Sequence, residues 1–127
     1  MNILPRLTAA LTFSLAAGFA SALDSQAYSA QALNDAQQAG KPVALHFHAD
    51  WCPTCRAQEK AFNDLKADKS LALTILVVNY DRERALKQKL GVRTQSTVIV
   101  YRGSQETARV AGETDPVKLR TALQSAL

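Results

Sequence analysis

Hydrophobic and polar residues alternate along much of the chain, and the period of the alternation changes from one stretch to the next. Residues 43–49 alternate with a period of two and predict a strand. Residues 71–80 are nearly all apolar, which is typical of a central strand covered on both faces. Residues 97–101 and 106–111 flank a turn at 102–105 and predict a hairpin.

Apolar residues spaced by three or four positions predict helices between these strands. The first covers residues 28–39 and ends at Gly40. The second runs from the cysteine pair to about Asp68, and the third begins at an N-capping Asp81 and ends at Gly91. The last begins at Asp115-Pro116. Helices that alternate with strands in this order predict a small α/β sandwich.

The first 22 residues have a different character from the rest. Residues 1–6 carry positive charge, residues 7–19 are apolar and uncharged, and Ala20-Ser21-Ala22 supplies small residues. The apolar run is shorter than the ~20 residues that a membrane span needs. We therefore predict a secretory signal peptide at residues 1–22 rather than an uncleaved anchor, and a soluble, monomeric mature chain at residues 23–127.

Composition and charge narrow the function classes. The mature chain, about 105 residues, suffices for one domain with its own core. The whole chain has 15 Lys and Arg against 11 Asp and Glu, and the basic residues are scattered among the acids. No basic cluster is long enough to form a nucleic-acid groove, so we expect no nucleic-acid partner.

The two cysteines, Cys52 and Cys55, are separated by two residues and follow a predicted strand directly. At a helix start, the unpaired backbone N–H groups favour a thiolate over a thiol. A structural disulfide across so few residues would remove little entropy from the unfolded chain. A structural zinc site would need ligands that no second cysteine pair supplies. The spacing therefore favours a redox-active dithiol.

Several motifs resemble the thioredoxin family in order and spacing. They are Lys-Pro-Val at 41–43, Ala-Asp-Trp-Cys-Pro-Thr-Cys at 49–55, Asn-Tyr-Asp at 79–81, Gly-Val-Arg at 91–93, Thr-Val-Ile-Val-Tyr-Arg-Gly at 97–103, and Gly112. The resemblance implies a thioredoxin-like three-layer α/β sandwich with a central mixed sheet. The family's usual first strand is expected to be missing or very short. Residues 40–63 are most similar to periplasmic thioredoxin domains that take electrons from a membrane-embedded transporter.

The resemblance also implies an activity and its residues. The expected activity is that of a periplasmic thiol–disulfide oxidoreductase, in which an exposed Cys52 attacks and a buried Cys55 resolves the mixed disulfide. We expect net reduction of protein disulfides, a membrane-embedded electron donor, and no cofactor or metal beyond the redox disulfide. The side chains expected at the substrate are Trp51, Pro53, Thr54, Gln95 and Ser96.

The chain departs from the family at positions that matter for chemistry. His46 replaces a buried aspartate, and Val77 replaces the lysine that would pair with it. We predict that His46 accepts the proton of Cys55, since imidazole titrates near pH ~6.5. A histidine satisfied by a backbone carbonyl is the alternative.

Ser96 replaces the proline whose cis peptide bond faces the dithiol in the family. A cis bond before a non-proline residue costs ~2.5–4 kcal/mol. We therefore predict a trans Gln95–Ser96 peptide and a hydroxyl that faces Cys52.

A second function uses the same cysteines. Cys52 and Cys55, with one or both of His46 and His48, have the ligand types of a site for copper(I) or zinc. A metal-binding thioredoxin-like protein is thus the alternative to the oxidoreductase.

Overall fold

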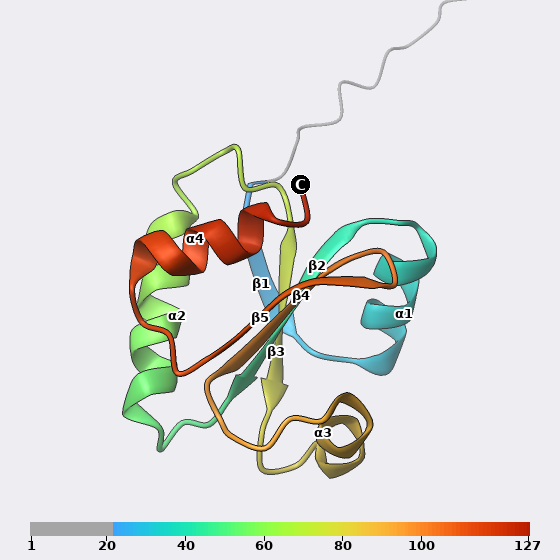
Figure 1. The fold of residues 1–127 in the computed structure, drawn as a ribbon, viewed down its shortest axis with the longest axis vertical. Helices are drawn as coiled ribbons and strands as arrows, with labels where there is room; N and C mark the ends of the chain where they lie inside the picture. The colour runs from blue at the N-terminus through green and yellow to red at the C-terminus, as the bar shows by residue number, and fades with distance from the viewer. Residues whose placement is uncertain (1–21) are drawn as a thin grey trace, which may run out of the picture.

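The computed structural model describes residues 22–127, which form one mixed sheet with helices on both faces (Figure 1). The strands are β1 (Asp24–Ala27), β2 (Pro42–His48), β3 (Thr74–Asn79), β4 (Thr97–Arg102) and β5 (Gln105–Ala111), in the spatial order β1-β3-β2-β4-β5. The first three run parallel, whereas β4 is antiparallel to β2 and β5 is antiparallel to β4. The mixed sheet is therefore confirmed.

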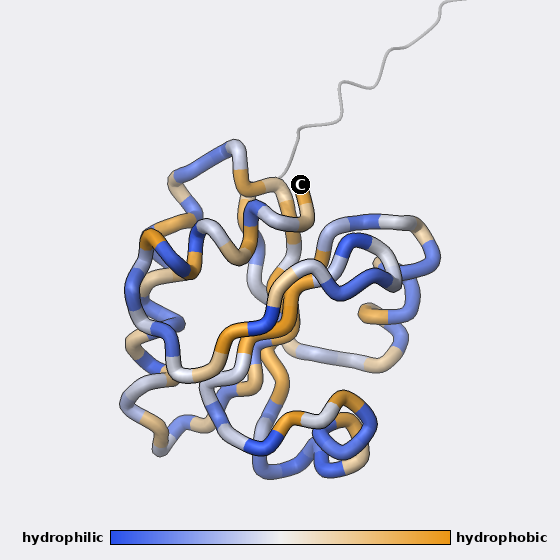
Figure 2. Tube along the Cα trace, in the orientation of Figure 1, coloured by the Kyte–Doolittle hydropathy of each residue, from blue (hydrophilic) through white to orange (hydrophobic). Residues whose placement is uncertain are grey.

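The helices α1 (Ala30–Gln38) and α3 (Arg84–Leu90) cover one face of the sheet, and α2 (Pro53–Leu65) and α4 (Pro116–Gln124) cover the other. Side chains of β2 alternate between the two cores. Leu45 packs on the α1 side and Ala44 on the α2 side, as the period of two predicts. Figure 2 shows the apolar segments gathered in the central strands. The three-layer sandwich is therefore confirmed.

The first strand of the family is present but short. Residues 24–27, Asp-Ser-Gln-Ala, pair with β3 in parallel register from Asp24 opposite Thr74 to Ala27 opposite Val77. This sequence has no apolar alternation because β1 is an edge strand and most of its residues are exposed. Its four residues agree with the expectation of a missing or very short strand.

Helix ends follow local chemistry in most places. Asp115 caps α4 by accepting the N–H of Val117 at 2.9 Å, as predicted. The prediction that Asp81 caps α3 is wrong, because α3 begins at Arg84 and its N-cap residue, Glu83, makes no side-chain bond to the backbone. Asp81 instead lies in the turn before α3, where its backbone N–H binds the side chain of Asn79.

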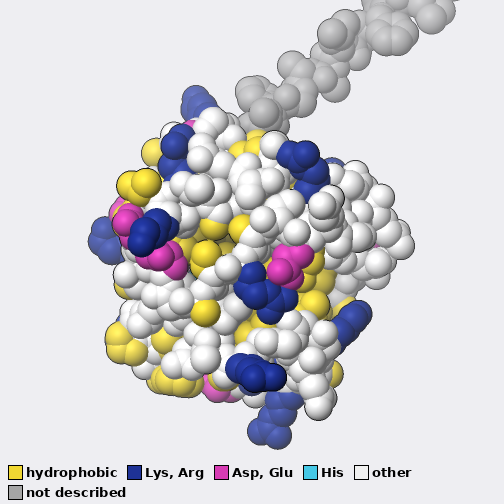
Figure 3. Space-filling view, viewed as in Figure 1, with side chains coloured by type: hydrophobic (Ala, Val, Ile, Leu, Met, Phe, Trp, Pro, Cys, Tyr) yellow, Lys and Arg dark blue, Asp and Glu magenta, His cyan; other side chains and the backbone are white. Residues whose placement is uncertain are grey.

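The predicted signal peptide lies outside the described residues, apart from Ala22. Within residues 22–127, no helix combines the length and the apolar character needed to cross a membrane. On the face shown in Figure 3, Lys and Arg side chains lie apart from one another with acidic side chains among them.

Candidate active site

The dithiol lies where β2 ends and α2 begins. The N–H of Cys52 donates to the carbonyl of Ala49 at 3.0 Å, which closes a turn after the strand. Cys52 is the N-cap residue of α2, and its Sγ accepts the N–H of Cys55 at 3.1 Å. Pro53 occupies the start of the helix, where its missing N–H is not needed. The backbone thus holds the first sulfur at the positive end of the helix.

The two thiols have opposite pKa shifts. Burial raises the pKa of Cys52, but hydrogen bonds from the thiol of Cys55, the hydroxyl of Ser96 and two backbone N–H groups outweigh burial and lower it. Burial is also the main effect on Cys55, where it raises the pKa, and the neighbouring Cys52 raises it further. Cys52 is therefore the sulfur that ionises first.

Cys52 is more enclosed than the sequence suggested. We expected an exposed sulfur, but the residue is only 2% exposed, and Cys55 is fully buried. Ala49, Cys55 and Tyr80 pack around Cys52, and the Ser96 side chain touches its sulfur. Tyr80 and Ser96 come from distant parts of the chain, so the cover over Cys52 is a tertiary effect.

Ser96 lies directly before β4 and faces both sulfurs. Its Oγ is 3.2 Å from Sγ of Cys52 and 3.2 Å from Sγ of Cys55. The Gln95–Ser96 peptide is trans, as predicted. The contact with Cys52 was also predicted, whereas the contact with Cys55 was not.

The backbone of Ser96 is held in an unusual conformation. Its φ of +66° lies in the left-handed region, which a residue with a Cβ rarely adopts. The Ser96 N–H donates to the carbonyl of Phe47 at 2.9 Å. Its carbonyl accepts from the N–H of Gly112 at 3.0 Å and from the side chain of Gln58 at 2.9 Å. Three hydrogen bonds therefore fix the position from which the hydroxyl reaches the sulfurs.

Gln58 is the site residue that sequence reasoning missed. Its side chain is fully buried on α2, and its Nε2 donates to the carbonyls of Ser96 and Glu113, each at 2.9 Å. Its Oε1 faces Nε2 of His46 at 3.0 Å. The available signal was its spacing, since position 58 follows Cys55 by three residues and precedes Phe62 by four, on the buried face of α2.

His46 is a neutral, buried histidine. Both amide hydrogens of Gln58 are used on carbonyls, so Gln58 offers only its oxygen, and Nε2 of His46 carries a hydrogen. Burial lowers the pKa of His46 to about 4; the bond to Gln58 opposes this shift and the neighbouring His48 adds to it. The partner is thus a side-chain amide rather than the backbone carbonyl of the alternative.

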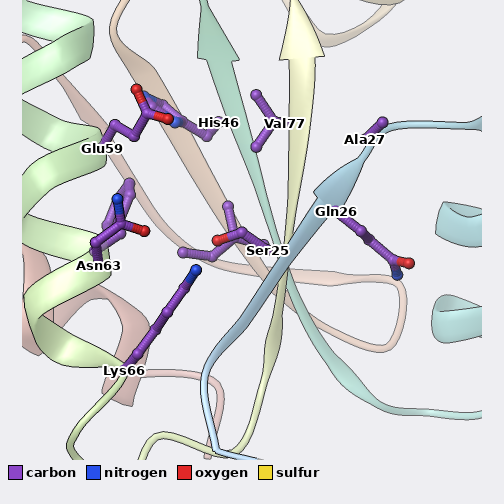
Figure 4. A pocket seen from close by; sticks show the side chains of 10 residues that line it. Ser25, Gln26, Ala27, His46, Glu59, Asn63, Lys66 and Val77 are labelled. Carbon is purple, nitrogen blue, oxygen red and sulfur yellow. The ribbon is translucent and has the colours of Figure 1, made fainter.

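The hydrogen bond of His46 leads to Gln58 and not to a sulfur. Proton acceptance by His46 stays a prediction. His46 also lines a cavity of about 350 Å³ between α2 and the β1–β3 edge of the sheet (Figure 4). Other side chains around this cavity are Ser25, Glu59, Asn63, Lys66 and Val77.

We expect His46 to make the fold sensitive to mild acid. Its pKa is about 4 in the folded chain against about 6.5 in the unfolded chain, so protons bind the unfolded chain more tightly between these values. The free energy of unfolding should have its full value above pH ~6.5 and fall by about 3 kcal/mol on acidification to pH ~4. Urea unfolding at several pH values measures this loss. His46→Gln should remove most of it, and an equal loss in both proteins would contradict the assignment.

His48 lies on the same side of β2, between two carboxylates. Its Nδ1 is 3.6 Å from Asp50 and its Nε2 is 3.4 Å from Glu59, and its ring meets that of His46 edge-on at 5.3 Å. In the described part of the chain, no three Cys, His, Asp or Glu side chains are arranged to hold a metal ion. The copper or zinc alternative stays a prediction.

The other predicted site residues surround the dithiol. Trp51 is 58% exposed, and its Nε1 donates to the carboxylate of Asp81 at 2.8 Å, which fixes the indole beside Cys52. Pro53 is exposed, whereas Thr54 and Gln95 are half-buried. An exposed aromatic ring held in one orientation beside a thiolate offers an apolar contact to a protein substrate.

Comparison with known proteins adds to this geometry. The sequence model of the thioredoxin family matches residues 22–125. The thiol:disulfide interchange protein DsbD of Escherichia coli O6:H1 is 37% identical over 94 residues, which cover 67% of this chain and 16% of the relative. DsbD of Yersinia pestis (strain Pestoides F) is 35% identical over 99 residues, 71% of this chain and 17% of the relative. The chain thus spans about a sixth of the length of these relatives.

Solved structures share the fold. Trxlp from Edwardsiella tarda EIB202 superposes with a TM-score of 0.73 at 39% identity, covering 80% of this chain and 98% of the other. The thioredoxin of Malassezia sympodialis gives a TM-score of 0.68 at 22% identity, with 84% and 95% coverage. The second likeness concerns the fold alone.

Proposed function

The chain belongs to the thioredoxin family of thiol–disulfide oxidoreductases, and we propose that it works outside the cytoplasm as a protein-disulfide reductase. One observation carries the proposal. The Sγ of Cys52 caps α2 and accepts the Cys55 N–H at 3.1 Å, with the Ser96 hydroxyl 3.2 Å away. A sulfur surrounded by donors at a helix start is poised as a thiolate, which is the attacking species in disulfide exchange.

The proposed reaction has two steps. The thiolate of Cys52 attacks one sulfur of a substrate disulfide, forms a mixed disulfide and releases the other substrate sulfur as a thiolate. The sulfur of Cys55, once deprotonated, attacks Sγ of Cys52 and releases the second substrate thiolate. The substrate gains two electrons, and the protein is left with a Cys52–Cys55 disulfide.

The surroundings of the dithiol suggest how substrates bind. We propose that Trp51, Pro53, Thr54, Gln95 and Ser96 contact the substrate. His46 is the proposed proton acceptor for Cys55; its imidazole is neutral, and its pKa of about 4 makes it a weak base. Because Cys52 is only 2% exposed, we propose that substrates present an extended segment to reach its sulfur.

Net reduction requires a supply of electrons, because the environment outside the cytoplasm is oxidising. The relatives named thiol:disulfide interchange protein support an exchange partner, and we propose a membrane-embedded donor. The mature chain is proposed to act as a soluble monomer on protein thiols and disulfides, without nucleic acid or cofactor.

A redox titration against glutathione tests the direction of the reaction. We expect a reduction potential near ~−270 mV, as in reducing thioredoxins, together with reduction of insulin disulfides by the pre-reduced protein. A potential near ~−120 mV, as in strong oxidants, would reject the reductase. The Cys52→Ala protein is the control for insulin precipitation that does not depend on the dithiol.

Export is the second part of the proposal. Its support is the positive leader, the apolar run and the Ala20-Ser21-Ala22 site that precede the domain. We expect the periplasmic form to begin at Leu23, as measured by N-terminal sequencing of the periplasmic fraction. A full-length protein found only in membranes would contradict cleavage after Ala22.

A further inference from the structure

We propose that the Ser96 hydroxyl is a hydrogen-bond donor shared by the two sulfurs, which turns from Cys52 to Cys55 as the negative charge passes between them. The Oγ of Ser96 is 3.2 Å from each sulfur. A hydroxyl has one hydrogen that rotates about the Cβ–Oγ bond, so either sulfur can be reached without moving the backbone. The shared donor rests on the dithiol exchange proposed above. It does not depend on whether that exchange reduces or oxidises the substrate, or on whether it takes place outside the cytoplasm.

The site fixes the oxygen and leaves only the hydrogen free. Ser96 is 3% exposed, and its backbone is held by Phe47, Gly112 and Gln58. Water therefore competes little for the hydroxyl, and a hydrogen bond to a charged sulfur is stronger in this buried place than in solvent.

The two sulfurs differ in the other hydrogen bonds they can use. Cys52 has the N–H of Cys55 at 3.1 Å, so its thiolate has a donor besides Ser96. The sulfur of Cys55 lies 3.9 Å from the carbonyl oxygen of Phe47, which has no hydrogen to give to a thiolate, and the N–H of Ala49 is its backbone donor. Each sulfur thus has a backbone donor of its own, and the hydroxyl of Ser96 is the donor that the two share.

The shared donor acts in each step as follows. In the reduced protein, the hydroxyl of Ser96 donates to the thiolate of Cys52, to which the thiol of Cys55 also donates. When Cys52 bonds to the substrate sulfur, its charge leaves with the first substrate thiolate, and the hydroxyl turns to Cys55. There it stabilises the thiolate that attacks Sγ of Cys52. Cys55 loses its proton to solvent before it attacks, and the first substrate thiolate takes up a proton from solvent, so no net proton is gained or lost.

A two-phase reaction with 5,5′-dithiobis(2-nitrobenzoic acid) tests the shared donor. The reduced protein releases one thionitrobenzoate when Cys52 attacks and a second when Cys55 resolves the mixed disulfide. The whole chain has two cysteines, so both phases come from the dithiol. Stopped-flow absorbance measures the two rates in one mixing experiment.

Two variants remove the hydroxyl in different backbones. Ser96→Ala removes the hydroxyl but still places a residue with a Cβ at a positive φ. Ser96→Gly removes the hydroxyl and also the backbone strain that the Cβ causes at this φ. We expect both to slow each phase by about tenfold at neutral pH and to raise the pH at which Cys52 ionises. Ser104→Ala, which removes an exposed hydroxyl in the β4–β5 turn, should leave both rates unchanged.

The outcomes separate the possibilities. A slow first phase with a normal second phase would show a donor that serves Cys52 alone, and unchanged phases would show no donor role; either result overturns the shared donor. Normal rates in Ser96→Gly with slow rates in Ser96→Ala would assign the effect to the backbone and overturn it as well. A wild-type protein that shows both phases but fails to reduce insulin would reject the reductase while leaving the shared donor in place.

Discussion

Replacing Cys55 with alanine is expected to leave the protein covalently joined to its substrates. Cys52 keeps its place at the start of α2 and its bond to the N–H of residue 55, so the attacking thiolate survives. The sulfur that would release the substrate is absent, and mixed disulfides should accumulate. Turnover with insulin should fall by about 10³-fold or more, since each sulfur is needed in every cycle. Non-reducing gels of cells that express the variant measure the trapped complexes.

The matched control is Cys52→Ala. Cys55 is fully buried and its pKa is raised, chiefly by burial, so it is a poor nucleophile toward an outside disulfide. This variant should lose turnover to the same extent but trap few partners. Equal trapping by the two variants would contradict the assignment of Cys52 as the attacking sulfur.

Ser96→Pro is expected to destabilise the fold by about 3 kcal/mol or more. Proline fixes φ near −65°, whereas residue 96 has a φ of +66°. Proline also lacks the N–H that donates to the carbonyl of Phe47, which would leave a buried acceptor unpaired. The family carries proline at this position, but this backbone cannot accept it unchanged. Urea unfolding followed by circular dichroism measures the loss.

Ser96→Gly is the control for the backbone argument. Glycine adopts a positive φ at little cost and keeps the N–H, so the variant should match the wild type or gain up to about 1 kcal/mol. A proline variant as stable as the wild type would show that the loop before β4 rearranges freely. In that case the three hydrogen bonds to the Ser96 backbone would not fix the site.

Most of the fold could be predicted from local patterns. The period of two in residues 43–49 and the cap at Asp115 depend on a few neighbouring residues, and both agree with the structure. The first strand was harder to predict from the sequence, because residues 24–27 are mostly polar and form a strand only through pairing with β3. The cap at Asp81 failed because the chain makes a turn after β3 before α3 begins.

The site was predictable where the chemistry lies in one stretch of sequence. Cys52, Cys55 and Trp51 are neighbours in sequence, and the structure places them together. The burial of Cys52 depends on Ser96, which lies 44 positions away in sequence. Gln58 gave only a weak signal, since one polar residue on a helix face does not reveal carbonyl partners 38 and 55 positions away.

Gln58 has an evolutionary consequence. Its side chain uses both amide hydrogens and its oxygen at once, on the carbonyls of Ser96 and Glu113 and on His46. An ionised glutamate at this position would have no hydrogens for the two carbonyls, and leucine would remove the hydrogen bonds to all three groups. Substitutions at positions 46, 58 and 96 would not have additive effects on stability, because Gln58 hydrogen-bonds to both of the other residues. We therefore expect the three positions to be replaced together or retained together during descent. Joint substitution at these three positions would therefore identify relatives with the same hydroxyl-lined dithiol more reliably than the cysteines alone.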